Sequence, residues 1–418
     1  MVNEVNTHSG EINSNNEIWI VLSDDWELRG NGQGRVLEKQ SIPAAKLMDL
    51  YDSLGIKSTF NVEVMQQLAF ERHSSSSLEI TEGRDEWRKS VVEMNRRGFD
   101  VQLHIHPQWW GAQLIDGWWK LNPKWHIVDY SKDEIECMVG ESISYLRDLL
   151  PNKTIKAFRG GAWGMGPPSK GVHAALVSHG IRLDMSIVSG LQYRGNNISL
   201  DYRSVDSPYT PFFSNYADVR RKSKGPEESS GLLEIPTQSV THLEFLSRIL
   251  CRGLQGNKVL LREFYSYFKM YLVENVFASL LQPFRAKRNP ESDMAFVPSF
   301  VHTDPFGFKS RRSKPPSPII DLSSRYSVEV WKVLVDIVIG RAMSIKSNGV
   351  KVLIFENHTK DLESDGDFCR IKEVLEYIKH NYRDVHFKMV SDVVPLAEET
   401  VSMWFAGQSC DFPLCVSQ

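Results

Sequence analysis

The chain has 418 residues, with 49 basic and 52 acidic side chains and a net charge of −3. At ~150 residues per domain, this length fits two or three domains, or one α/β barrel carrying a large insertion. A hydrophobic content of 41% argues for a folded core, and the near balance of charge argues against nucleic acid as a partner. Five cysteines without a Cys-x-x-Cys pair argue against a disulfide framework or a thiolate zinc site.

The first 16 residues are polar and are expected to form a disordered tail. They hold no apolar run of the kind that a secretory signal needs, so a cytoplasmic protein is expected. No run approaches the ~18 uncharged apolar residues of a membrane helix, and no membrane span is predicted.

Short apolar runs alternate with helical patterns along most of the chain, which is typical of parallel β/α architecture. Strands are expected at 17–22, 57–62, 100–106, 154–159, 181–188, 351–355 and 385–390, and helices at 42–54, 84–97, 131–149, 172–178 and 368–382. The count favours a distorted parallel β/α barrel formed by residues 17–201 and 327–405.

Between 202 and 326 this alternation breaks, and the segment is interpreted as a long, mostly helical insertion. Residues 257–283 form one long helical candidate that is rich in aromatic residues and basic at both ends. It can pack on the barrel or on a second copy, or make peripheral contact with a membrane surface. Leu232–Ile235 and Phe296–His302 remain candidates for barrel strands.

The strongest local signal is the sequence from Val101 to Pro107, in which apolar and polar residues strictly alternate. On a strand, His104 and His106 then point to the same face, with Cα atoms roughly 6.5 Å apart. Two imidazoles at that spacing can bind one metal ion. Alternatively, both are hydrogen-bonded histidines on a polar strand face.

Other polar groups follow predicted strands. Asp24 and Asp25 end the first strand; one can bind a metal while the other acts as a general base, or both belong to a solvated turn. Arg159, before Gly160, can hold a carboxylate, or can lie at the surface. His358 can serve as a general acid. All these residues fall at the carboxyl ends of predicted strands, where β/α barrels carry their active sites.

Five of the 11 tryptophans lie between Trp109 and Trp125, directly after the histidine pair. Such a loop can stack on sugar rings, which makes Trp109 a candidate for substrate binding, or it can be a packed loop core.

These motifs resemble those of the NodB-homology polysaccharide deacetylase family. The double aspartate at 24–25, the strand ending in His106-Pro107, the Arg159–Trp163 segment and the strand reaching His358 occur in the family's order. Three differences are the spacing of the histidines, which are two rather than four residues apart, Ala162-Trp163 in place of Pro-Tyr, and Ser23 in place of the usual Phe before the double aspartate.

The resemblance implies a divalent metal, most often zinc, held by Asp25, His104 and His106. It makes Asp24 the general base, oriented by Arg159, and His358 the acid that protonates the leaving amine, with His302 as a competing candidate. It also places the backbone N–H of Trp163 at the developing oxyanion and its side chain near the substrate.

The expected activity is therefore metal-dependent removal of an N-acetyl group from an amino sugar, in a polysaccharide or in a nucleotide- or lipid-linked precursor of a surface glycan. Two alternatives stay open. One is a metal-dependent amidohydrolase acting on a non-sugar amide, and the other is a non-catalytic glycan-binding protein on a degenerate barrel.

Overall fold

The computed structural model describes residues 17–166, 170–194, 199–272, 321–324, 326–346 and 349–405. Its main element is a nine-stranded sheet in the order β10-β11-β7-β6-β3-β2-β1-β12, with β13 also paired to β1. The strands of this sheet are β1 (Ile18–Trp26), β2 (Thr59–Glu63), β3 (Asp100–Ile105), β6 (Ala157–Gly160), β7 (Leu183–Asp184), β10 (Phe212–Asn215), β11 (Ser229–Glu234), β12 (Lys351–His358) and β13 (Val385–Lys388). Two small hairpins stand apart from it: β4 (Gln113–Ile115) with β5 (Trp118–Lys120), and β8 (Gln192–Arg194) with β9 (Ser199–Asp201).

Neighbouring strands from β12 through β1, β2, β3, β6 and β7 to β11 are all parallel, and only β10 runs antiparallel. The two ends of this sheet meet where Thr237, just after β11, forms a parallel bridge with Ile354 of β12. Gln238 reinforces the junction, because its side chain accepts from the Ile354 N–H and donates to the Val352 carbonyl. The predicted distorted parallel β/α barrel is thus confirmed, with bridges rather than a full ladder closing it.

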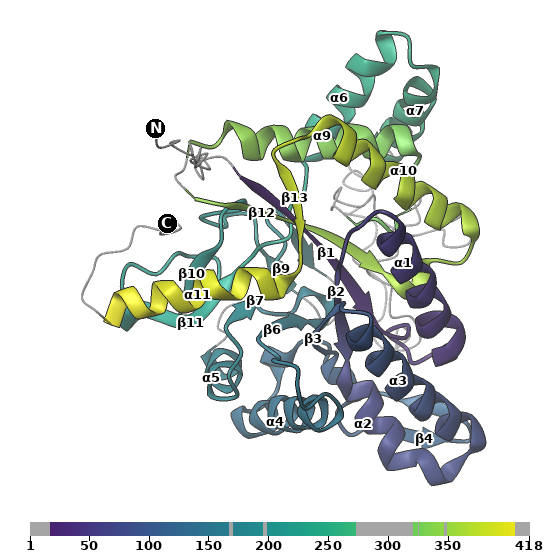
Figure 1. Cartoon of the computed structure of the whole chain (residues 1–418), viewed down its shortest axis with the longest axis vertical. Coiled ribbons are helices and arrows are strands. Elements are labelled where there is room, and N and C mark those ends of the chain that lie inside the picture. Colours follow the sequence, from purple (N-terminus) through teal and green to yellow (C-terminus); the bar gives the residue numbers. More distant parts are fainter. Residues whose placement is uncertain are drawn as a thin grey trace, which may run out of the picture.

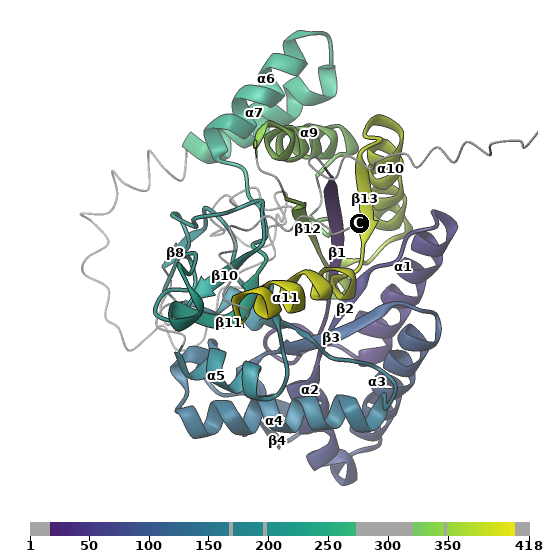
Figure 2. The ribbon, with the colours of Figure 1, turned by 60° about the vertical axis from the view of Figure 1, so that its left-hand side comes forward.

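Helices surround the strands in an arc, as Figure 2 shows from α9 and α10 through α1 and α3 to α4 and α5. Their bounds are α1 (Ile42–Ser53), α2 (Val64–His73), α3 (Leu78–Arg96), α4 (Lys132–Leu149), α5 (Lys170–Ser178), α6 (His242–Leu254), α7 (Lys258–Leu272), α9 (Val328–Ser344), α10 (Asp365–Asn381) and α11 (Val390–Phe405). The predicted capping box is present at α4, where Ser131 and Glu134 bond each other's backbone N–H groups. Helices α6 and α7 form a hairpin that protrudes beyond α9 (Figure 1).

Strand alternation divides the apolar residues into two groups. Ile20 and Leu22 of β1 pack into the large core under the helices, whereas Val21 joins a second core inside the barrel with Ile354 of β12. Helix α11 contributes Val393 to this inner core. The same alternation decides which polar side chains at the strand ends face the interior of the barrel.

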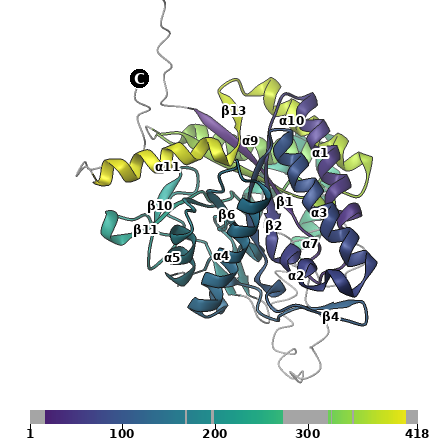
Figure 3. The same ribbon diagram turned by 60° about the horizontal axis from the view of Figure 1, so that its bottom comes forward.

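Part of the predicted insertion belongs to the barrel. Leu232–Ile235, a candidate strand in the sequence, largely coincides with β11, which pairs with β7. The helical candidate at 257–283 begins as α7, and its continuation beyond residue 272 lies outside the described residues, as do Phe296–His302 and the 1–16 tail. Helices α2 and α11 and the β4–β5 hairpin, seen away from the main sheet in Figure 3, were not predicted.

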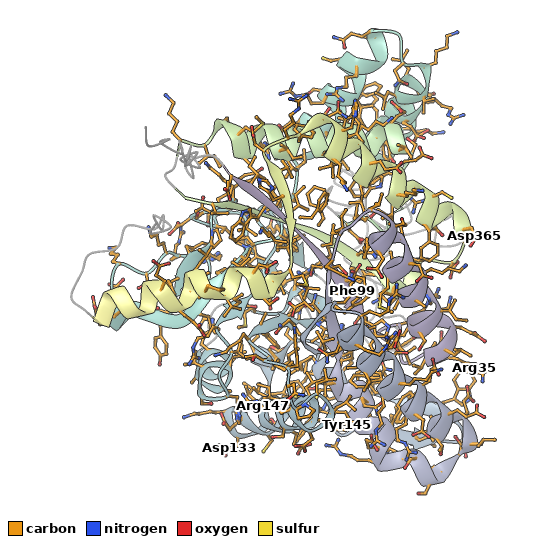
Figure 4. All side chains as sticks on the ribbon, viewed as in Figure 1. Arg35, Phe99, Asp133, Tyr145, Arg147 and Asp365 are labelled. Atoms are coloured by element: carbon orange, nitrogen blue, oxygen red, sulfur yellow. The ribbon has the colours of Figure 1, made fainter. Side chains whose placement is uncertain are left out.

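Charged side chains cover the outer faces of the helices. Arg35, Asp133, Arg147 and Asp365 are exposed on this outer layer, whereas Phe99 is buried beneath it (Figure 4). In the part of the chain that the structure describes, no helix has the length and apolar character needed to cross a bilayer.

Candidate active site

Inward-facing polar side chains gather at the carboxyl ends of β1, β3, β6 and β12. On β3, Val101, Leu103 and Ile105 pack into the outer core, so His104 and His106 share the opposite, inner face. The predicted geometry of the pair is present: the two imidazole centroids lie 4.7 Å apart. Glu63, at the end of β2, accepts a hydrogen bond from the backbone N–H of His106 at 2.5 Å and so fixes the end of β3.

The carboxylate that meets both histidines is Glu27, not Asp25. Glu27 lies just after β1, is 3% exposed, and its Oε2 contacts Nε2 of His106 directly and Nε2 of His104 at 3.3 Å. The ligand atoms of Glu27, His104 and His106 all lie within 4.8 Å of one another. The expected ligand set of Asp25, His104 and His106 is therefore corrected in one member. Asp25 interacts electrostatically with His104 but does not complete the group.

The hydrogen bond of His104 shows that this group suits a cation. Nδ1 of His104 lies 2.7 Å from the carbonyl oxygen of Arg159, which can only accept, so Nδ1 carries the proton. In the neutral ring Nε2 then has a lone pair, which faces the Glu27 carboxylate. Two acceptors face each other in a buried site, and only a proton or a metal ion between them makes the contact favourable. The residues therefore fit a divalent metal held by two imidazoles and one carboxylate.

Lys360 forms an ion pair with the other oxygen of the Glu27 carboxylate. Its buried ammonium contacts Oε1 of Glu27, which leaves Oε2 facing the imidazoles. Burial raises the pKa of Glu27, but His106 and Lys360 outweigh this effect and hold that pKa well below its usual value. Glu27 is thus ionised, as a metal ligand must be.

Asp25 belongs to a second group beside the first. The Nε of Arg159 donates to Oδ2 of Asp25 at 3.3 Å, and Asn61 donates to Oδ1 at 2.9 Å. Arg159 is fully buried and also pairs with Glu356 of β12. Burial alone raises the pKa of Asp25, but the charges of Arg159, His104 and His358 bring it below its usual value. The expected role of Arg159, orienting a carboxylate, therefore applies to Asp25 in this structure.

His358 completes this second group. Its Nε2 lies 3.7 Å from Oδ2 of Asp25 and 3.5 Å from Glu356, while its Nδ1 lies 3.3 Å from Asp321. Burial lowers the pKa of His358, but the charge and hydrogen bond of Asp321, together with the charge of Glu356, outweigh burial and bring the pKa to about 10. The imidazole is therefore protonated at neutral pH and can act as an acid. The competing candidate His302 lies outside the described residues.

Asp24, the residue expected to be the general base, points the other way. It follows Leu22 on the helix-facing side of β1, where Tyr51 of α1 and Asn357 of β12 donate to its Oδ1 at 3.0 and 2.8 Å. Adjacent residues of a strand face opposite sides, so only Asp25 reaches the interior. Of the two aspartates, Asp25 is therefore the one placed beside the other groups of the candidate site.

The buried position of Asp24 predicts a pH-dependent difference in stability. Burial raises its pKa from 3.8 to about 6, so the cost of ionising it in the folded state develops as the pH rises through that value. Asp24→Asn removes this cost. Relative to the wild type, its free energy of unfolding should increase by about 2 kcal/mol between pH 4 and pH 7. Urea unfolding at the two pH values, in the presence of a chelator, tests this; a difference that does not change with pH contradicts it.

The turn after β6 brings the backbone close to the imidazole of His106. Ala162 and Trp163 have φ values of +52° and +53°, a conformation that is rare for non-glycine residues and that concentrates at functional sites. This turn directly follows Arg159 and Gly160, at the rim where the resemblance places the backbone N–H of Trp163.

Within this turn, Gly161 packs directly against the imidazole of His106. A Cβ at this position would lie 2.7 Å from Cγ of His106, so Gly161→Ala must displace the imidazole. We expect at least about 10-fold weaker zinc binding, since a shift of ~1 Å in a site residue costs up to ~10²-fold in function. Gly166→Ala is the matched control, because its Cβ would meet none of the described residues within 4 Å. Isothermal titration with Zn²⁺ compares the two, and equal affinities would contradict the expectation.

The two tryptophans expected to bind substrate differ in their surroundings. Trp109 is 2% exposed and packs edge-on against Phe70 and Trp119, so it belongs to the loop core and is not available for stacking. The Trp163 indole N–H donates to Glu356 at 3.2 Å and thus lies beside the second group. On the β4–β5 hairpin, Trp118 is 69% exposed.

No family model matches this sequence, and no curated protein does. Solved structures of similar shape include a putative polysaccharide deacetylase from Mycobacterium smegmatis, with TM-score 0.48, 12% identity, and coverage of 97% of this chain and 96% of the other. An allantoinase, PuuE, has TM-score 0.45, 11% identity and coverage of 94% and 92%. A 4-alpha-glucanotransferase from Thermococcus litoralis has TM-score 0.44, 10% identity and coverage of 91% and 40%. The similar structures thus include the family that the motifs resemble, at a similarity too low to transfer an activity.

Proposed function

We propose that this chain is a metal-dependent hydrolase that removes an N-acetyl group from an amino sugar. The observation that carries the proposal is the pairing of two groups at one barrel rim. One group, Glu27, His104 and His106, suits a cation, and the other holds an ionised carboxylate 3.7 Å from a protonated imidazole.

A divalent metal bound there would supply an acidified water and a positive charge for the amide oxygen. Asp25 accepts the proton of the attacking water, and its carboxylate is ionised and held in place by Arg159. His358 donates a proton to the departing nitrogen, which is a poor leaving group until protonated. The backbone N–H of Trp163 donates to the amide oxygen as charge develops on it.

The amino-sugar part of the proposal rests on the motif resemblance and on the exposed Trp118. The hairpin that carries this indole follows His106 closely in the chain, and a flat aromatic face suits stacking on a pyranose ring. Whether the sugar is free, polymeric, or linked to a nucleotide or lipid is a question for the substrate panel. Zinc is the first metal to test, because two imidazoles and a carboxylate are typical ligands of catalytic zinc.

The test uses the full chain, stripped with a chelator and reloaded with Zn²⁺, Co²⁺ or Mn²⁺. Acetate release is measured from N-acetylglucosamine, its oligomers, UDP-N-acetylglucosamine and a non-sugar N-acetyl amide. The proposal is supported if the metal-loaded protein releases acetate from any of the sugars and the metal-free protein does not. Release from the non-sugar amide alone favours a general amidohydrolase. Metal binding or sugar binding without any hydrolysis contradicts the proposed activity.

A further inference from the structure

The two histidines of the cation site differ in the group that faces their outer nitrogen. A histidine that binds metal through Nε2 must carry its proton on Nδ1 and donate it to an acceptor, which fixes the ring orientation. For His104 that acceptor is the carbonyl of Arg159. For His106 the group at Nδ1 is the side-chain amide of Gln108, whose Nε2 lies 2.9 Å away.

This contact, as it stands, favours the wrong tautomer for metal binding. An amide nitrogen can only donate, so Nδ1 of His106 would accept and Nε2 would hold the proton against Glu27. The amide oxygen of Gln108 is meanwhile buried and has no hydrogen-bond partner among the described residues. A carboxamide presents nearly the same shape with its two ends exchanged, so a half-turn places Oε1 at the ring without moving other atoms.

We propose that Gln108 is a positioning residue that sets the tautomer of His106: its Oε1 accepts the Nδ1 proton when metal is bound, which frees Nε2 as a ligand. The inference rests on the proposed metal site and adds a residue to it. Gln108 is 1% exposed, so its side chain is buried beside the His106 ring that it contacts.

Two substitutions separate this role from simple packing. Gln108→Leu keeps the approximate volume but cannot accept, and we expect Zn²⁺ affinity to fall about 10- to 100-fold. Gln108→Glu can accept but cannot donate when ionised, and we expect an affinity equal to or above that of the wild type. Gln113→Leu, in the exposed strand β4 of the same loop, is the matched control and should bind Zn²⁺ as the wild type does.

Zn²⁺ affinity is measured by competition with a chromogenic chelator, and the tautomer by ¹⁵N NMR of labelled histidine in the wild type with and without Zn²⁺. A slowly exchanging, hydrogen-bonded Nδ1–H of His106 in the loaded wild type supports the proposal even if a variant fails to fold, because Gln108 is the side chain at that nitrogen; an Nδ1–H that exchanges rapidly contradicts it. Equal losses in Gln108→Glu and Gln108→Leu, or none in Gln108→Leu, overturn it. A wild type that binds no Zn²⁺ overturns the proposed metal site itself, and is thereby distinguished from failure of the Gln108 role alone.

Discussion

Replacing Asp25 by Asn is expected to lower kcat for amide hydrolysis by about 10²–10⁴-fold, the usual contribution of a general base. Asparagine has nearly the shape of aspartate and can still meet Arg159 through its oxygen, but it cannot take a proton from water. The Zn²⁺ affinity should change little by comparison, because the proposed ligands are Glu27, His104 and His106. Steady-state kinetics on the best substrate of the panel, together with zinc titration, measure both quantities.

Asp24→Asn is a closely matched control, one residue away and on the opposite face of β1. Its partners are Tyr51 and Asn357 on the helix-facing side, so we expect kcat within a few-fold of the wild type. The motif resemblance alone predicts the reverse, since it makes Asp24 the base. A large loss in Asp24→Asn with an active Asp25→Asn would therefore contradict the roles that the structure supports.

This contrast shows what the sequence could predict about the site. Strict alternation placed His104 and His106 on one face of a strand, and the structure has them there, because a period of two needs no knowledge of distant residues. Applied to β1, the same rule separates Asp24 from Asp25 and puts Glu27 on the same side as Asp25. The alternation therefore indicates Glu27 from the sequence alone, even though the adjacent pair Asp24-Asp25 is the more conspicuous pattern.

Other members of the site could not be found in this way. Glu356 and Lys360 reach the site only because β12 lies next to β1. These two strands are more than 300 residues apart in the chain. Asp321 reaches Nδ1 of His358 from within the predicted insertion, through a bridge to Glu356 that local periodicity does not reveal. Such partners follow from how the barrel closes, so the order of elements could be predicted while the full set of charges could not.

Removing one of the proposed ligands should have the second large effect. Glu27→Ala and His104→Ala are each expected to weaken Zn²⁺ binding by about 10² or more, since zinc sites gain ~3 kcal/mol per ligand. In Glu27→Ala, affinity falls for a second reason as well. The positive charge of Lys360 then stays beside the site without its carboxylate partner and repels the cation. His104→Ala instead removes the ring that the Arg159 carbonyl orients.

Thermal unfolding with and without Zn²⁺ gives an independent readout. Binding to the folded state alone stabilises by about 2.7 kcal/mol at 100 times the dissociation constant, so the wild type should gain in Tm. Both variants should lose most of that gain. His179→Ala, which removes a partly exposed histidine paired with Glu136 at the surface, should keep it. If all three variants retained the zinc-dependent shift, the ion would bind elsewhere, and Glu27 would be better explained as the buried partner of Lys360.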